Sequence, residues 1–200
     1  MLRLKGCIAV VGLLALIGSP SVEAEQVTVG NAKVVVKTVT GIFEGDLRML
    51  KLQDDVYHNE AIETEAESAT QISFVDDTTL TLGPNSKVVL DKFVYDPDPS
   101  KASFVMTATQ GVFRFASGKL PKKAYKINTP AATIGIRGTV LEIAILPPGA
   151  AGGEGGRTVE ILVTSGEAMV LTCHGQAITL GGEQPAARIS QAAEEDCSAR

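Results

Sequence analysis

Apolar and polar residues alternate through most of this chain, and clusters of turn-forming residues separate the alternating runs. Ile72 and Phe74 alternate, Asp76-Asp77 supplies a turn, and Leu80 and Leu82 alternate back, which is the pattern of a β-hairpin. Similar runs recur along the chain, and no stretch shows the period of an amphipathic helix. The sequence therefore predicts an all-β fold: a sandwich, a jelly roll or a roll-like stack of short antiparallel strands.

Length and charge limit the class of protein further. The chain has 200 residues, a length typical of one domain, and 44% of them are hydrophobic, which is enough for a sizeable core. The net charge is −5, so a nucleic acid would find no basic surface to bind, and we exclude that partner.

Residues 1–24 are predicted to be a secretory signal peptide. Arg3 and Lys5 form a basic start, residues 8–17 are apolar, and residues 22–24 fit a cleavage site. The apolar run is shorter than the roughly 20 residues that cross a bilayer, so we expect no transmembrane span after cleavage. This predicts a periplasmic or secreted protein.

The remainder divides into a β domain at 25–182 and a polar C-terminal tail at 183–200, which is alanine-rich and could hold a short helix. Residues 147–156, PPGAAGGEGG, are predicted to be a flexible loop that connects the two strands of a hairpin.

Two cysteines, Cys173 and Cys197, lie beyond the signal peptide, and an even number in an oxidising compartment favours a disulfide between them. A metal site at Cys173 and His174 is the alternative, but the spacing of the ligands that zinc requires is missing. We expect the disulfide, and we expect neither a metal nor a cofactor.

No catalytic motif is present. The glycines of residues 111–119 have the wrong spacing for a phosphate-binding loop, and Leu120 stands where that motif needs Ser or Thr. There is no G-x-S-x-G, and Ser, His and Asp form no recognisable arrangement. The sequence predicts a protein that is not an enzyme.

A cluster of carboxylates lies in a short strand or loop just before the clearest strands, at Glu60, Glu63, Glu65 and Glu67. A solvated acidic face is the interpretation that we prefer over paired catalytic carboxylates, because a catalytic pair would have to share a cleft.

Three stretches resemble the FecR domain family, a periplasmic module of bacterial envelope signalling. They are HNEAIETEAESATQISFVDDTTLTLGPNSKVVLDKFVYDP at 58–97, GVFRFASGK at 111–119 and INTPAATIGIRGT at 127–139. The resemblance implies an all-β domain that works by contacting other envelope components. Membrane-spanning FecR-type regulators also have a cytoplasmic segment and a transmembrane helix. This chain shows neither, so we expect a stand-alone exported domain and do not carry over sigma-factor regulation.

Candidate contact residues lie in and near the last of these stretches. Arg137 stands between Gly135 and Gly138, and its guanidinium could bind a partner's carboxylate or close the sheet through an internal ion pair. Lys119, Lys122 and Lys123 surround Pro121 in a loop, a small basic group on an acidic protein.

The function predicted from these features is a non-catalytic FecR-like module that binds a protein in the envelope. A cell-wall or surface polysaccharide binder is the alternative, although the absence of Trp argues against stacking on sugars. An envelope hydrolase is the least favoured class.

Overall fold

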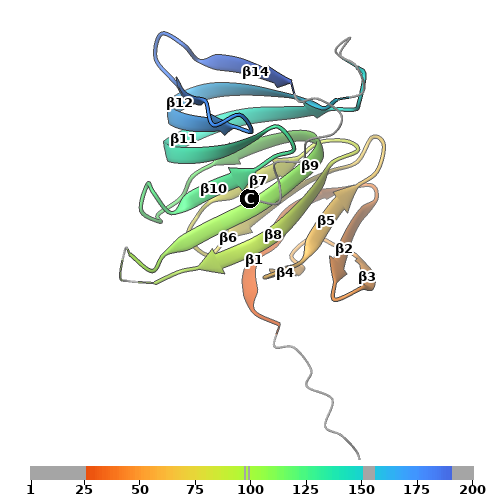
Figure 1. Ribbon diagram of the computed structural model, residues 1–200. Coiled ribbons are helices and arrows are strands. Elements are labelled where there is room, and N and C mark those ends of the chain that lie inside the picture. The colour runs from red at the N-terminus through yellow and green to blue at the C-terminus, as the bar shows by residue number, and fades with distance from the viewer. Residues whose placement is uncertain (1–25, 97, 99, 151–155, 191–200) are drawn as a thin grey trace, which may run out of the picture.

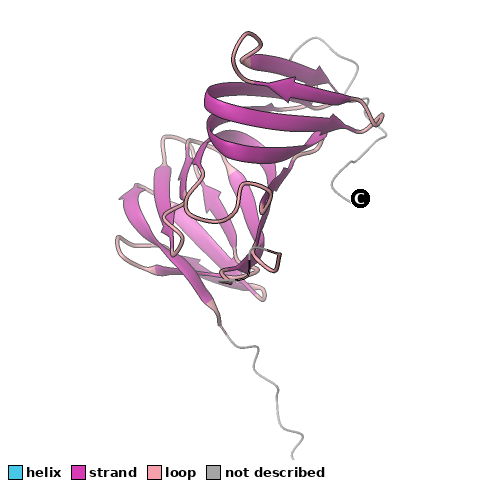
Figure 2. Ribbon diagram, turned by 90° about the vertical axis from the view of Figure 1, so that its left-hand side faces the viewer, coloured by secondary structure: helices cyan, strands magenta, loops and turns pink. Residues whose placement is uncertain are grey.

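The computed structural model describes residues 26–96, 98, 100–150 and 156–190, and this part of the chain contains strands and loops without any helix (Figures 1 and 2). The all-β prediction is confirmed. The strands are β1 (Thr28–Val36), β2 (Val39–Phe43), β3 (Asp46–Met49), β4 (Asp55–Tyr57), β5 (Ala61–Thr64), β6 (Ala69–Phe74), β7 (Thr79–Leu82), β8 (Lys87–Val94), β9 (Ser103–Ala116), β10 (Tyr125–Asn128), β11 (Ala132–Leu146), β12 (Thr158–Thr172), β13 (Ala177–Leu180) and β14 (Ala186–Ser190). No helix among these residues is long and apolar enough to cross a membrane.

The strands form two hydrogen-bonded layers that share β9, β11 and β12. In the layer that we call sheet I the order is β3-β2-β5-β8-β9-β10-β11-β12-β13, and in sheet II it is β4-β1-β6-β7-β9-β11-β12-β14. The first half of β9 pairs with β8 and β10, and its second half pairs with β7 and β11. All pairs are antiparallel except β9 with β10.

Three glycines mark the points where the shared strands pass from one sheet to the other. Gly111, Gly138 and Gly166 have φ values of 98°, 68° and 79°, in the left-handed region that glycine adopts most easily. At Gly166 the packing is closest, because a Cβ there would lie 2.0 Å from the carbonyl oxygen of Gly138. The predicted short strands are therefore wrong for β9, β11 and β12, which are 14, 15 and 15 residues long and bend instead of ending.

One hydrophobic core fills the space between the two sheets. Phe104 lies at its centre, with ring centroids 4.9 Å from Phe74 on sheet II and 5.5 Å from Phe115. Inward and outward residues alternate strictly along β6 and β7, as the sequence predicted for this hairpin. Aromatic pairs at these separations add to the stability that burial supplies.

An ion pair with a buried carboxylate links the open ends of the two sheets and corrects one prediction. Glu60 was expected on a solvated acidic face, but it is 0% exposed and its carboxylate lies 2.8 Å from the guanidinium of Arg48 on β3. Arg48 also donates to the backbone oxygen of Asp55 and lies over the ring of Tyr57, both on β4. The pair therefore joins sheet I to sheet II.

The C-terminal prediction is also corrected. Residues 183–200 were expected to form a tail, but β14 occupies 186–190 and pairs with β12. Ile189 is the one large apolar residue of this strand, so no alternating pattern announced it. The signal peptide at 1–24 and Cys197 lie outside the described residues, so export and the Cys173–Cys197 disulfide stay predictions. The glycine-rich loop does connect the antiparallel pair β11 and β12.

Candidate functional site: a basic depression at the sheet corner

The loop between β9 and β10 carries the three predicted lysines, and a buried network holds its first part in place. The hydroxyl of Tyr125 donates to Asp76 Oδ2 at 2.8 Å and accepts from the Leu120 amide at 3.0 Å. The hydroxyl of Thr78 also donates to Asp76 and accepts from the Gly118 amide. Burial, followed by the bond to Asp76, raises the pKa of Tyr125 to about 12. The phenol therefore keeps its proton and anchors the loop.

Lys119 differs from the other two lysines because it forms an ion pair. Its ammonium lies 2.5 Å from the carboxylate of Asp77 in the β6–β7 turn, and this contact raises the pKa of Lys119. The Lys119 amide donates to the backbone oxygen of Asp76 at 2.7 Å, which fixes the position of the residue. Lys119 therefore joins two turns at the surface, and the structure does not place it among the residues that line the depression described next.

Lys122 and Lys123 meet Arg137 around a shallow hollow that we call the basic depression. It has a volume of about 440 Å³ and is lined by Lys122, Lys123, Arg137, Gly138, Gly166 and Glu167. It lies where β11 and β12 bend between the sheets. The bend matters because a bare glycine at 138 leaves room for Lys122, whose Cε would be 3.4 Å from a Cβ at that position. The sheet corner thus gathers three cations from two separate parts of the chain.

Arg137 forms the internal ion pair that was the alternative to partner binding, but the distance between the charged groups is long and both side chains are exposed to solvent. Its Nη1 lies 3.9 Å from Glu167 Oε2, and the two side chains are 54% and 60% exposed. An exposed pair of this kind contributes about 0–1 kcal/mol, so the fold does not depend on it. The guanidinium keeps donors available for a carboxylate of another molecule.

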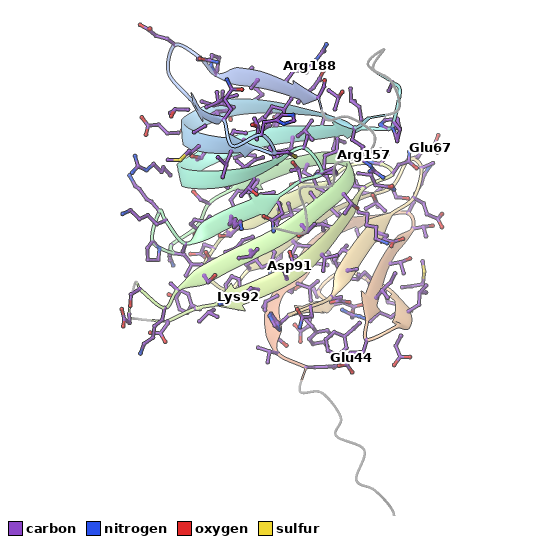
Figure 3. The ribbon with its side chains drawn as sticks, viewed as in Figure 1. Glu44, Glu67, Asp91, Lys92, Arg157 and Arg188 are labelled. Carbon is purple, nitrogen blue, oxygen red and sulfur yellow. The ribbon has the colours of Figure 1, made fainter. Side chains whose placement is uncertain are left out.

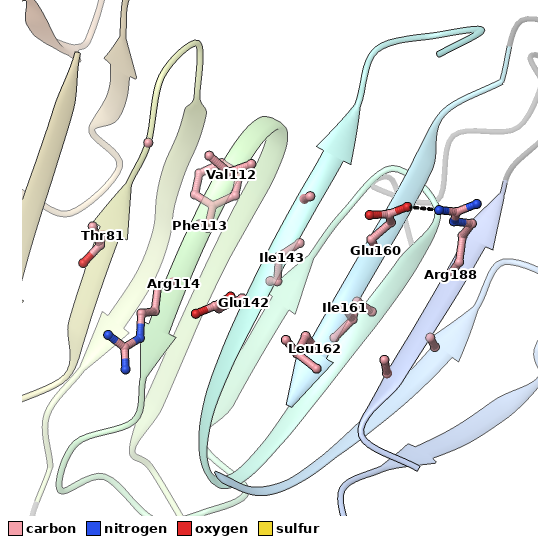
Figure 4. A pocket seen from close by; sticks show the side chains of 14 residues that line it. Thr81, Val112, Phe113, Arg114, Glu142, Ile143, Glu160, Ile161, Leu162 and Arg188 are labelled. Atoms are coloured by element: carbon pink, nitrogen blue, oxygen red, sulfur yellow. Dashed lines mark ion pairs between the residues drawn. The ribbon is translucent and has the colours of Figure 1, made fainter. Parts of the chain in front are cut away.

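A second and larger hollow, of about 720 Å³, lies on the outer face of sheet II; we call it the sheet groove (Figure 4). Its lining includes small residues of β7, β11 and β14, namely Thr81, Ala144 and Ala186, and Val112 and Leu162 are its exposed apolar residues. Arg114, Glu142, Glu160 and Arg188 bring equal numbers of both charges, and Arg188 lies 2.5 Å from Glu160. Sequence reasoning missed this groove, because its lining residues are scattered over five strands and share no motif.

The two hollows differ in the charges that line them. The basic depression holds cations and one exposed carboxylate, and the sheet groove holds balanced charges on an open surface. Within the described ranges, no group of three His, Cys, Asp or Glu side chains is placed to hold a metal ion.

Comparison with known families identifies the domain. A family model described as FecR protein matches residues 60–169, more than half of the chain. The chain belongs to the FecR family. This membership indicates a regulatory or signalling module of the envelope. All the residues that line the basic depression lie inside the matched range, whereas the sheet groove also uses β14, beyond its end. A comparison with curated proteins found no match.

Proposed function

We propose that the chain is a non-catalytic, exported FecR domain that binds a protein partner in the cell envelope through the basic depression. The observation that carries this proposal is the convergence of Lys122, Lys123 and Arg137 on one hollow of a protein whose net charge is negative. A basic surface attracts an acidic segment of a partner, and like charges across an interface suppress the binding of other partners.

The partner chemistry that fits is an acidic segment. Arg137 can bind one carboxylate with two parallel hydrogen bonds, and the flexible lysines can follow neighbouring carboxylates. Glu167 is the one acidic side chain lining the hollow. It holds Arg137 only at 3.9 Å, so a partner's carboxylate can replace it at little cost.

Export supports the same proposal from a different direction. The predicted signal peptide at residues 1–24 would deliver the domain to the compartment where envelope proteins present their exposed segments. In that compartment the domain would act as a stand-alone signalling or scaffolding module.

Capture from envelope extract tests the proposal with a charge-matched control. The test variant combines Lys122→Glu, Lys123→Glu and Arg137→Glu. The control combines Lys33→Glu, Lys92→Glu and Lys101→Glu, exposed cations that line neither hollow. Lys101, like Arg137, forms an exposed ion pair at 3.9 Å, in its case with Asp98. Wild type and control should retain the same protein, and the test variant should lose it.

Two results would refute the assignment. Equal loss by the control would mean that net charge alone attracts the partner. Equal retention by the test variant would move the binding surface elsewhere. Retention of glycan without protein would support the polysaccharide alternative. The sheet groove does not favour that alternative, because Phe113, the aromatic residue in its lining, is only 3% exposed and cannot stack on a sugar.

A further inference from the structure

The edge strand β3 presents an unpaired backbone to solvent. Among the described strands it pairs only with β2, through a two-residue turn at Glu44 and Gly45, and it lies at the outer end of sheet I (Figure 1; Glu44 is labelled at the tip of this hairpin in Figure 3). The Leu50 amide donates to Val39 on β2 at 2.9 Å. Because the ladder of an antiparallel pair alternates, the amides and carbonyls of Leu47 and Met49 point away from β2.

The solvent-exposed side chains of this edge are apolar. Leu47 is 68% exposed, Met49 is 51% exposed, and Leu52, just beyond the strand, is 60% exposed. Arg48 lies between the first two but faces inward, where Glu60 binds it. Natural sheets protect an edge with charged side chains, a proline, a bulge or a short strand. The charge in the middle of β3 is Arg48, which Glu60 compensates, and no proline or bulge interrupts the strand, so the outward backbone of Leu47 and Met49 can accept another strand.

We propose that the occupant is the β3 strand of a second copy of this chain, paired antiparallel about a two-fold axis at Arg48. In that register Leu47 of one copy lies opposite Met49 of the other, and each pair exchanges backbone hydrogen bonds. The same register stacks Leu47 on Met49 twice, on the outer face of the joined sheet. The interface is self-complementary, as a two-fold dimer requires.

Charge favours the antiparallel arrangement of two copies. Glu44 and Asp46 lie at the start of the hairpin strand, and Lys51 follows its end. Antiparallel pairing brings the acidic start of one copy beside the lysine of the other, whereas parallel pairing would align like charges. The two arginines at the axis do not repel strongly, because the carboxylate of Glu60 compensates each of them.

Sedimentation of the purified protein over a dilution series tests the dimer. Leu47→Lys and Met49→Lys should each raise the dissociation constant by about a hundredfold, since two-fold symmetry places each substitution in the interface twice. Val75→Lys is the matched control, because Val75 is 55% exposed and lies in the β6–β7 turn. It should leave the dissociation constant unchanged.

Cysteine cross-linking tests the register. A mixture of Leu47→Cys and Met49→Cys proteins should form a disulfide between the two variants, because hydrogen-bonded partners place their Cα atoms about 5.5 Å apart, within disulfide reach. Either variant alone should cross-link poorly. The proposal fails if the wild type stays monomeric up to its solubility limit, or if the lysine variants dimerise like the control. If β3 instead binds an apolar strand of a different protein, the purified wild type will stay monomeric, which also refutes the dimer.

Discussion

The guanidinium of Arg48 lies 2.8 Å from the carboxylate of Glu60, which has no exposure to solvent, and the pair holds the open edges of the two sheets together. Arg48 Nε donates to Glu60 Oε1 at 2.9 Å, and the Tyr57 amide donates to Glu60 Oε2 at 2.9 Å. Gly41 makes the approach feasible, since a Cβ there would lie 2.2 Å from the carboxylate.

Removing the cation of this pair should be much more costly than removing the cation of an exposed pair. Arg48→Ala leaves a buried carboxylate without its partner, and we expect a loss of about 3–5 kcal/mol in the free energy of unfolding. Lys87→Ala breaks the pair with Glu63, whose side chains are 42% and 37% exposed, and should lose about 0–1 kcal/mol. Urea denaturation of both variants measures the difference. Equal losses would mean that the Arg48 pair is not a buried clamp.

The pH dependence of stability should carry the signature of Glu60. Burial raises the pKa of Glu60 above 4.5, although the hydrogen bonds from Tyr57 and Arg48 oppose this shift. The folded state therefore binds this proton more tightly than the unfolded state. The resulting stability is fully present below pH 4.5 and is lost as the pH rises through the raised folded pKa.

The free energy of unfolding of wild type, relative to that of Glu60→Gln, should accordingly be highest at low pH and fall toward neutrality. Asp91, whose pKa burial also raises, is present in both proteins and cancels in this comparison. Denaturation of the two proteins at a series of pH values measures the difference. A relative stability that rises with pH would contradict the direction of the shift.

The bend that shapes the basic depression should depend on Gly166. Gly166→Ala places a Cβ 2.0 Å from the Gly138 oxygen, so backbone must move, and we expect a loss of more than about 4 kcal/mol or failure to fold. Gly175→Ala is the matched control, because Gly175 also has a positive φ, 76°, but no atom lies within 4 Å of a Cβ there. It should lose about 1–2 kcal/mol. Similar thermal unfolding of the two variants would show that the corner tolerates displacement.

The alternation of apolar and polar residues was sufficient to predict the fold class, but it did not predict which face of each strand is buried. The hairpin of β6 and β7 followed from alternation and a turn at Asp76-Asp77. The same alternation at Leu47 and Met49 did not reveal which side of β3 faces water. Apolar residues of a strand usually face inward, but on β3 the charged Arg48 faces inward and the two apolar residues face solvent. Burial of Glu60 was hidden as well, because its partner lies on another strand and its neighbours in sequence are also acidic.

The candidate site was predictable in part. Lys122, Lys123 and Arg137 were singled out as residues of a basic loop and a glycine-bracketed strand, and the structure brings them to one hollow. Lys119 was grouped with them by sequence proximity, but its pair with Asp77 depends on the packing of two distant turns. Gly166 and Glu167 could not be foreseen, since the bend that places them beside Arg137 arises from strand pairing.

Photocross-linking in living cells tests the central claim most directly. A photoreactive benzophenone amino acid would replace Lys123 at the basic depression and, in a matched protein, Lys92, an exposed lysine on β8 that does not line the depression (Figure 3). The account predicts that one envelope protein cross-links from position 123 and not from position 92, and that Arg137→Glu weakens this cross-link. Cross-links of equal strength from both positions, or none from position 123 in cells where capture succeeds, would contradict it.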